Sequence, residues 1–156
     1  MTRIFLGLLL VLMVGQVKAE SCVFPAHDLT ALPDTGGAPL EVDIHLYLSD
    51  LNEIHDSKQS FVSVVFIRAQ WQDSRLVHSG TEPCYVEETD IWTPQLQMLN
   101  RRSVERVRAP QFSVTPDGEV LQLVRVYGDF SFRADLSDFP FDEQQLRFII
   151  VSGYEI

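Results

Sequence analysis

The strongest constraint on the fold is a strict alternation of apolar and other residues from Leu40 to Ser49. Leucine, valine and isoleucine fill every second position, and acidic residues, histidine, tyrosine and serine fill the positions between them. A period of two is typical of a β-strand with one buried face, because successive side chains point to opposite faces of the strand. We therefore expect residues 40–48 to form a strand whose apolar side chains face a core.

Further segments rich in valine, isoleucine and aromatic residues predict strands along the rest of the chain. Turn residues separate them at intervals, and Pro116-Asp117-Gly118 is a strong hairpin signal. The predicted strands cover residues 61–71, 85–89, 112–115, 119–127 and 145–151, with a polar turn over 52–60 and one helix around 27–32. This pattern is typical of an all-β protein with an immunoglobulin-like β-sandwich.

The segment from Asp135 to Phe148 contains an unusual loop with the sequence Phe139-Pro140-Phe141-Asp142. Proline fixes φ near −65° and lacks a backbone donor, so this loop cannot join a strand ladder. Burying one phenyl ring is worth roughly 1.5–3 kcal/mol, which makes apolar rings at a loop tip costly in water. Two interpretations remain open: the loop docks against a neighbour, or it is tucked under its own sandwich.

Residues 1–19 have the features of a secretory signal peptide, which would leave residues 20–156 as the exported chain. Removing residues 1–19, which contain Arg3 and Lys18 and no acidic residue, takes the formal charge from −10 to −12. A strongly acidic chain is unsuited to nucleic acid, whose phosphates require a basic surface. Export also permits a disulfide between Cys22 and Cys84, although two free thiols are the alternative.

Four motifs in the same order resemble the pentameric ligand-gated ion channels, the Cys-loop receptor superfamily. The FPFD loop resembles the signature loop of that family, but Phe132 and Leu146 stand where the loop cysteines would be, as in its prokaryotic branch. We expect both side chains to point into the core and to replace the bridge by packing. The other three motifs are Trp71-x-Asp73-x-Arg75-Leu76, Trp92-x-Pro94-x-Leu96 ending at Asn100, and Val114-Thr115-Pro116-Asp117-Gly118.

This resemblance implies the amino-terminal part of an extracellular ligand-binding domain, C-terminally incomplete, with sites formed between subunits. It places Leu99 on one side of such a site, and Phe66, Leu121 and Leu123 on the other. Phe66 would contact a ligand through its π face, and the alternative is an ordinary core residue. Leucines at the other positions make an aromatic box for a quaternary amine doubtful. Trp71 and Trp92 are expected to be structural, because large rings at fixed strand positions usually fill cores.

The resemblance also implies a gating role for Phe139, Pro140, Phe141 and Asp142, together with the turn that contains Lys58. These parts would press on a membrane pore domain that this sequence does not contain. The expected partners are further copies of the chain in a homopentamer and a small ligand or protons, with no cofactor and no nucleic acid. The expected location is the periplasmic face of a bacterial inner membrane.

The remaining features do not indicate catalysis. The four histidines lack metal-ligand spacing, and no nucleophile elbow or phosphate-binding loop is present in the sequence. Arg101, Arg102, Arg106 and Arg108 form a basic cluster, which is either an anion or intersubunit site or a solvated loop. Two other functions stay open: a soluble periplasmic binding protein of the same fold, or an unrelated exported β-sandwich that binds carbohydrate or metal.

Overall fold

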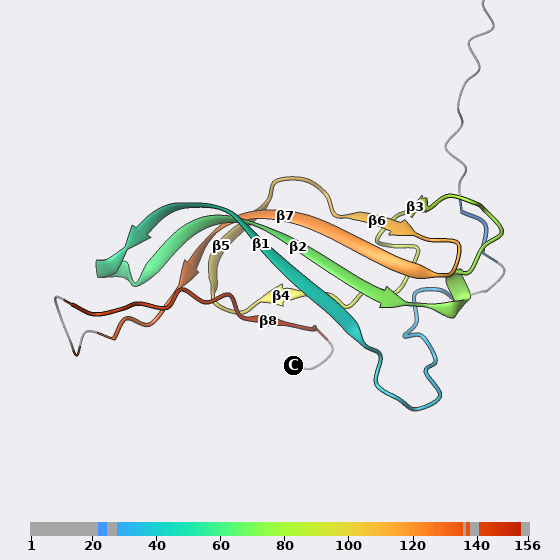
Figure 1. Cartoon of the computed structure of the whole chain (residues 1–156), viewed down its shortest axis with the longest axis horizontal. Coiled ribbons are helices and arrows are strands. Elements are labelled where there is room, and N and C mark those ends of the chain that lie inside the picture. The colour runs from blue at the N-terminus through green and yellow to red at the C-terminus, as the bar shows by residue number, and fades with distance from the viewer. Residues whose placement is uncertain (1–21, 25–27, 136, 138–140, 154–156) are drawn as a thin grey trace, which may run out of the picture.

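The computed structural model describes residues 22–24, 28–135, 137 and 141–153, so the signal-peptide prediction lies outside the described residues. Two antiparallel sheets make up the fold (Figure 1). The larger has the strand order β1-β2-β7-β6-β3, with β5 also paired to β7, and the smaller pairs β4 with β8. The strands are β1 (Val42–His55), β2 (Ser60–Gln72), β3 (Cys84–Val86), β4 (Gln97–Met98), β5 (Arg101–Arg106), β6 (Gln111–Val114), β7 (Glu119–Ser131) and β8 (Ile150–Val151). The prediction of an all-β sandwich is confirmed.

The central strands β2 and β7 pair along their whole length, from Ser60 opposite Ser131 to Gln72 opposite Glu119. Burial alternates along β2, because one face looks toward the second layer and the other looks away from it. Two groups of buried residues lie on the core face. One surrounds Trp71 and Trp92, whose rings make an edge contact at 5.8 Å, and this confirms that both are structural. The other contains Phe61, Val65, Ile67, Met98, Val126 and Phe130.

Phe132 and Leu146 replace the missing loop bridge by packing, as predicted. Both are partly buried and contact the second core group at the base of the FPFD loop. The Phe61 ring lies 6.3 Å from the Phe132 ring and 5.3 Å from the Phe148 ring. The loop is therefore anchored at its base by aromatic contacts in place of a covalent link.

The Pro116-Asp117-Gly118 hairpin forms where it was predicted, with the Thr115 amide donating to the Glu119 carbonyl at 2.9 Å. Gly118 has φ +84°, and a Cβ there would lie 2.6 Å from the carbonyl oxygen of Asp73, so glycine is required on both counts. The Thr115 hydroxyl donates to the Asp117 carboxylate and thereby lowers the pKa of Asp117. The hydrogen bond from Thr115 therefore stabilises the folded chain at pH values above the pKa that Asp117 has in the unfolded chain. This stabilisation is lost as the pH falls through the lowered pKa of Asp117 in the folded chain.

The Trp-x-Asp-x-Arg-Leu motif fastens the amino-terminal segment to the sheet. Asp73 is buried, and it caps the short 3-10 helix Ser74–Leu76 by accepting from the Arg75 amide at 3.0 Å. The Arg75 guanidinium forms two bonds with the same carboxylate, at 2.9 and 2.8 Å. It also donates to the carbonyls of Asp28 and Ala31, at 3.2 and 2.9 Å. The bond to Asp73 raises the pKa of Arg75, so the cation persists at every accessible pH.

The structure contains a disulfide and not two free thiols. Cys22 and Cys84 are bonded, with their Cα atoms 5.7 Å apart and 62 positions apart in sequence. Cys84 is buried, and Cys22 packs against the core group around Trp71 and Trp92. The bond therefore ties the start of the described chain to β3.

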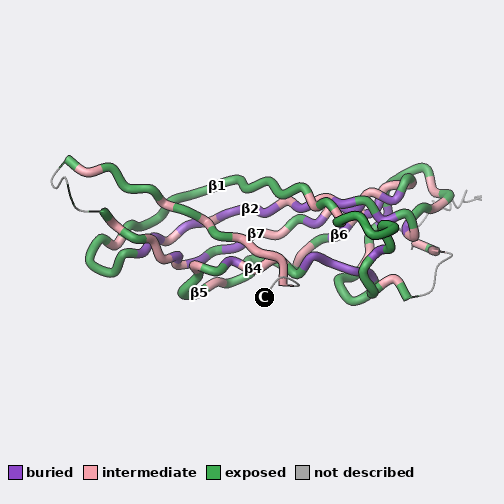
Figure 2. Tube along the Cα trace, turned by 90° about the horizontal axis from the view of Figure 1, so that it is seen from below, coloured by how far each residue is buried: buried purple, intermediate pink, exposed green. Residues whose placement is uncertain are grey.

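Four predictions about local structure are corrected. Ile44, Leu46 and Leu48 lie on the core face of the sheet but are 39–56% exposed, because β1 is an edge strand that the second layer does not cover (Figure 2). The strand β1 also runs on to His55 through two register shifts, which shortens the turn to the 3-10 helix Asp56–Lys58 and Gln59.

The other two corrections concern the ends of the described chain. Residues 28–32 form a turn and not a helix, because Asp28 has φ +57° and its carbonyl is held by Arg75; His27 lies outside the described residues. Within the predicted strand 145–151 only Ile150–Val151 is a strand. The preceding backbone is held by Asn100, whose side chain donates to the Arg147 carbonyl and accepts from the Ile149 amide.

Candidate ligand-binding site

One face of the large sheet carries three of the four predicted ligand-binding residues. Phe66 on β2 is opposite Arg125 on β7, and Leu123 and Leu121 follow at successive second positions of β7. These side chains point away from the core, since Val65 and Ile67 on either side of Phe66 are buried and Phe66 is only half-buried. The alternative that Phe66 is an ordinary core residue is therefore wrong.

Phe66 is the middle of a cross-strand row that sequence reasoning did not identify. Tyr47 on β1 lies opposite Phe66, and it is 52% exposed. On the other side, the guanidinium carbon of Arg125 lies 5.3 Å from the centre of the Phe66 ring, a cation–π contact. Arg68 is two residues further along β2 on this face. The row through Phe66 thus combines two aromatic rings with the cation of Arg125, and Arg68 adds a second permanent cation on the same face.

Leu99 lies in the other layer of the sandwich. It directly follows β4, and its amide donates to the carbonyl of Ile149 at 2.8 Å. The preceding residue, Met98, belongs to the core group that packs against the opposite side of the sheet from Phe66. Leu99 itself is 54% exposed. Within one chain, the structure does not bring Leu99 together with Phe66, Leu121 and Leu123.

The base of the FPFD loop and the turn that follows β1 lie at the same end of the molecule (Figure 1). The Phe132 amide donates to the Gln59 carbonyl at 3.0 Å, which joins the base of the FPFD loop to the turn that follows Lys58. Phe141 is 89% exposed, and Asp142 is half-buried and accepts a bond from the Gln144 side chain. Phe139 and Pro140 lie outside the described residues.

The arginines of the basic cluster are exposed, as the solvated alternative expects, but most of them belong to a strand and not to a loop. Arg101, Arg102 and Arg106 belong to β5, which pairs with β7, and only Arg108 lies beyond the strand. Arg106 makes a salt bridge of 3.7 Å with Glu88, and Arg102 donates to the Lys58 carbonyl at 2.5 Å. Among the described residues, no group of three or more histidine, cysteine, aspartate or glutamate side chains is arranged to hold a metal. No helix in the described part of the chain is long and apolar enough to cross a membrane.

A family model described as the neurotransmitter-gated ion-channel ligand binding domain matches residues 21–153. The chain therefore belongs to this family, the ligand-binding domains of pentameric ligand-gated channels. It is 26% identical over 143 residues to the gamma-aminobutyric acid receptor subunit theta of Mus musculus, a match that covers 86% of this chain and 22% of that protein.

It is also 26% identical over 145 residues to the proton-gated ion channel of Gloeobacter violaceus, covering 90% of this chain and 40% of that protein. A third relative, the gamma-aminobutyric acid receptor subunit beta-4 of Gallus gallus, is 24% identical over 83% of this chain and 28% of its own length. The chain thus spans less than half the length of these curated relatives.

Proposed function

We propose that this chain is the extracytoplasmic ligand-binding domain of a bacterial pentameric channel subunit, exported by residues 1–19 to the periplasmic face of the inner membrane. Five copies would form a ring around a pore domain that lies outside residues 1–156. The observation that carries this proposal is the separation of Leu99 from Phe66, Leu121 and Leu123 on opposite layers of one sandwich. Such residues can share a ligand only if a second copy supplies the other half of the site.

The expected stimulus is a small ligand or protons, and the chemistry of the Phe66 face disfavours a quaternary amine as that ligand. Arg125 already lies over the Phe66 ring, so a ligand cation would meet a fixed positive charge. Leu121, Leu123 and Leu99 offer no further aromatic faces. A neutral or anionic group is better suited to this face than a cationic one.

The relay to the pore would run through the exposed Phe141 and Asp142, together with Lys58 in the turn that contacts the base of this loop. Phe139 and Pro140 belong to the same proposed contact. An apolar ring that is 89% exposed at a loop tip gains free energy by docking against a neighbour. Such a relay requires that the ligand bind two conformations of the ring with different affinities.

Phe141→Ala in the full-length subunit is expected to reduce the current evoked by an acid step at least tenfold, because the loop loses its apolar contact with the pore domain. Whole-cell recording with surface labelling measures current per subunit at the membrane. The matched control is Leu32→Ala, since Leu32 is also an exposed apolar residue but lies in the amino-terminal segment. Equal currents from Phe141→Ala and Leu32→Ala would contradict the proposed relay of protons to a pore. So would the absence of any acid-evoked current from cells that carry the full-length subunit at their surface.

A further inference from the structure

The disulfide between Cys22 and Cys84 has a histidine beside one of its sulfur atoms. The Nε2 atom of His78 lies 3.5 Å from Cys84 Sγ and 3.3 Å from the carbonyl oxygen of Val114. His78 belongs neither to the proposed ligand site nor to the loop that is expected to contact a pore. A ring nitrogen at this distance can act on the chemistry of the bond.

The hydrogen bonds of the His78 ring fix which nitrogen carries the proton. The Gly80 amide donates to Nδ1 at 3.1 Å, so Nδ1 is the acceptor and the proton of the neutral ring is on Nε2. A Cβ at Gly80 would lie 2.8 Å from Nδ1, so glycine lets the backbone come this close to the ring. The His78 amide donates to the Pro116 carbonyl at 3.2 Å, which fixes the residue to the hairpin between β6 and β7. The Nε2–H group is therefore held beside Cys84.

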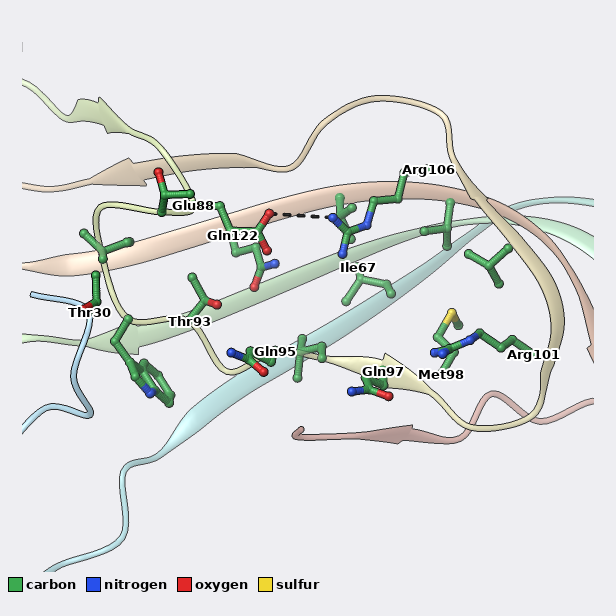
Figure 3. A pocket seen from close by; sticks show the side chains of 17 residues that line it. Thr30, Ile67, Glu88, Thr93, Gln95, Gln97, Met98, Arg101, Arg106 and Gln122 are labelled. Atoms are coloured by element: carbon green, nitrogen blue, oxygen red, sulfur yellow. Dashed lines mark ion pairs between the residues drawn. The ribbon is translucent and has the colours of Figure 1, made fainter. Parts of the chain in front are cut away.

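The two cysteines differ in their exposure to solvent. Cys84 is 8% exposed and belongs to β3, whereas Cys22 is half-buried and is followed by the exposed Val23. A cavity of about 680 Å³ lies between the layers of the sandwich, but its lining includes neither cysteine (Figure 3). A thiol from solution therefore meets the bond at the outer surface, and it meets Cys22 first.

Thiol–disulfide exchange at this bond has a preferred direction. A thiolate attacks Cys22 Sγ, a new S–S bond forms there, and Cys84 leaves as a thiolate with the electron pair of the broken bond. The proton of the attacking thiol is released to solvent. A disulfide sulfur is a weak hydrogen-bond acceptor and a thiolate is a strong one, so the Nε2–H group of His78 stabilises the leaving group more than the intact bond.

Hydrogen bonds that do not involve the disulfide hold both of its ends in place. The Arg75 guanidinium donates to two backbone carbonyls of the amino-terminal segment that follows Cys22, at 3.2 and 2.9 Å. Cys84 is paired with Val114 in the ladder between β3 and β6. After the bond opens, Cys84 therefore stays close to Cys22 and can attack the new disulfide in turn.

We propose that Cys22 is a site of reversible thiolation by low-molecular-weight thiols, with Cys84 as the leaving and resolving sulfur. The modified chain carries the thiol as a mixed disulfide on Cys22 and a free thiolate on Cys84, which accepts a hydrogen bond from His78. Attack by that thiolate on Cys22 releases the thiol and restores the original bond. The site is independent of the ligand site between subunits and of the relay to a pore.

The test uses reduced glutathione in large excess, at several concentrations, on the purified full chain. Samples are quenched with acid and then N-ethylmaleimide, and peptide mass spectrometry locates both groups. We expect glutathione on Cys22, N-ethylmaleimide on Cys84, and a rate that is proportional to the glutathione concentration. His78→Asn keeps an acceptor for the Gly80 amide but lacks the donor beside Cys84, so it should lower this rate about tenfold. His78→Gln, whose amide nitrogen can take the place of Nε2, should retain most of the wild-type rate.

The matched control is His45→Asn, at an exposed position of β1, which should leave the rate unchanged. Unfolding would expose the bond and raise the rate, so it cannot imitate the expected decrease. Three results would each overturn the proposal: glutathione on Cys84, a rate for His78→Asn equal to that of the wild type or of His78→Gln, or a rate that does not depend on the glutathione concentration. The last result would show that the bond opens only after the domain unfolds. None of these results bears on the proposed channel function, which the acid-evoked currents test separately.

Discussion

Replacing Cys84 with serine is expected to lower the free energy of unfolding by about 4 kcal/mol. The disulfide to Cys22 closes a loop with a sequence separation of 62, and in the chain-entropy model a loop of that size restricts the unfolded state by about this amount. The loss is a large part of the roughly 5–15 kcal/mol that stabilises an ordinary domain. Chemical denaturation of the wild type and the variant, followed by tryptophan fluorescence, measures the difference.

A reduction experiment controls for the serine itself. Dithiothreitol should lower the stability of the wild type by a similar amount and should leave Cys84→Ser unchanged. Cys22→Ser should match Cys84→Ser to within about 1 kcal/mol, and the double variant should add little to either, because all three remove the same bond. Independent and additive effects of the two serines would show that the bond does not form.

Replacing Asp73 with alanine is expected to cost about 3 kcal/mol of stability. The change removes a buried carboxylate that holds both guanidinium bonds of Arg75 and caps the helix Ser74–Leu76. Removing one partner of a buried ion pair typically costs 3–5 kcal/mol, and partial exposure of Arg75 places this case at the lower end. Thermal and chemical denaturation measure the loss.

Two further variants serve as comparisons for Asp73→Ala. Asp43→Ala, at an exposed position of β1, is expected to change stability by less than about 0.5 kcal/mol. Arg75→Gln leaves the Asp73 carboxylate buried without its cation, so it should be at least as harmful as Asp73→Ala. Equal stability of Asp43→Ala and Asp73→Ala would contradict a structural role for the motif.

Several parts of the fold were predictable because their signals are local. Alternation indicated β1, apolar β-formers indicated β2 and β7, and Pro116-Asp117-Gly118 indicated the hairpin between β6 and β7. The strand β5 was missed because its sequence, Arg-Arg-Ser-Val-Glu-Arg, has a single apolar residue and no period of two. It becomes a strand only through its ladder with β7, and that pairing is a contact between distant segments.

The candidate site was predictable to the same extent. Phe66 could be located from its position in the sequence relative to Trp71. Its neighbours Tyr47 and Arg125 could not, because they are brought beside it by the register of three strands, and no single segment encodes that register. The burial of β1 was overestimated for a related reason. Alternation shows which side chains share a face, but whether a second layer covers that face depends on the rest of the fold.

The most direct test of the central claim is a crosslinking experiment on the full-length subunit that carries both Leu99→Cys and Leu123→Cys. Both positions are exposed, and the native cysteines are already bonded to each other. A short bismaleimide should join neighbouring copies into a ladder that ends at five, and Leu32→Cys with Leu123→Cys should give no ladder. Crosslinks that form only within single chains would contradict a ligand site shared between subunits. The same holds if the copies stay associated and no crosslink forms between them.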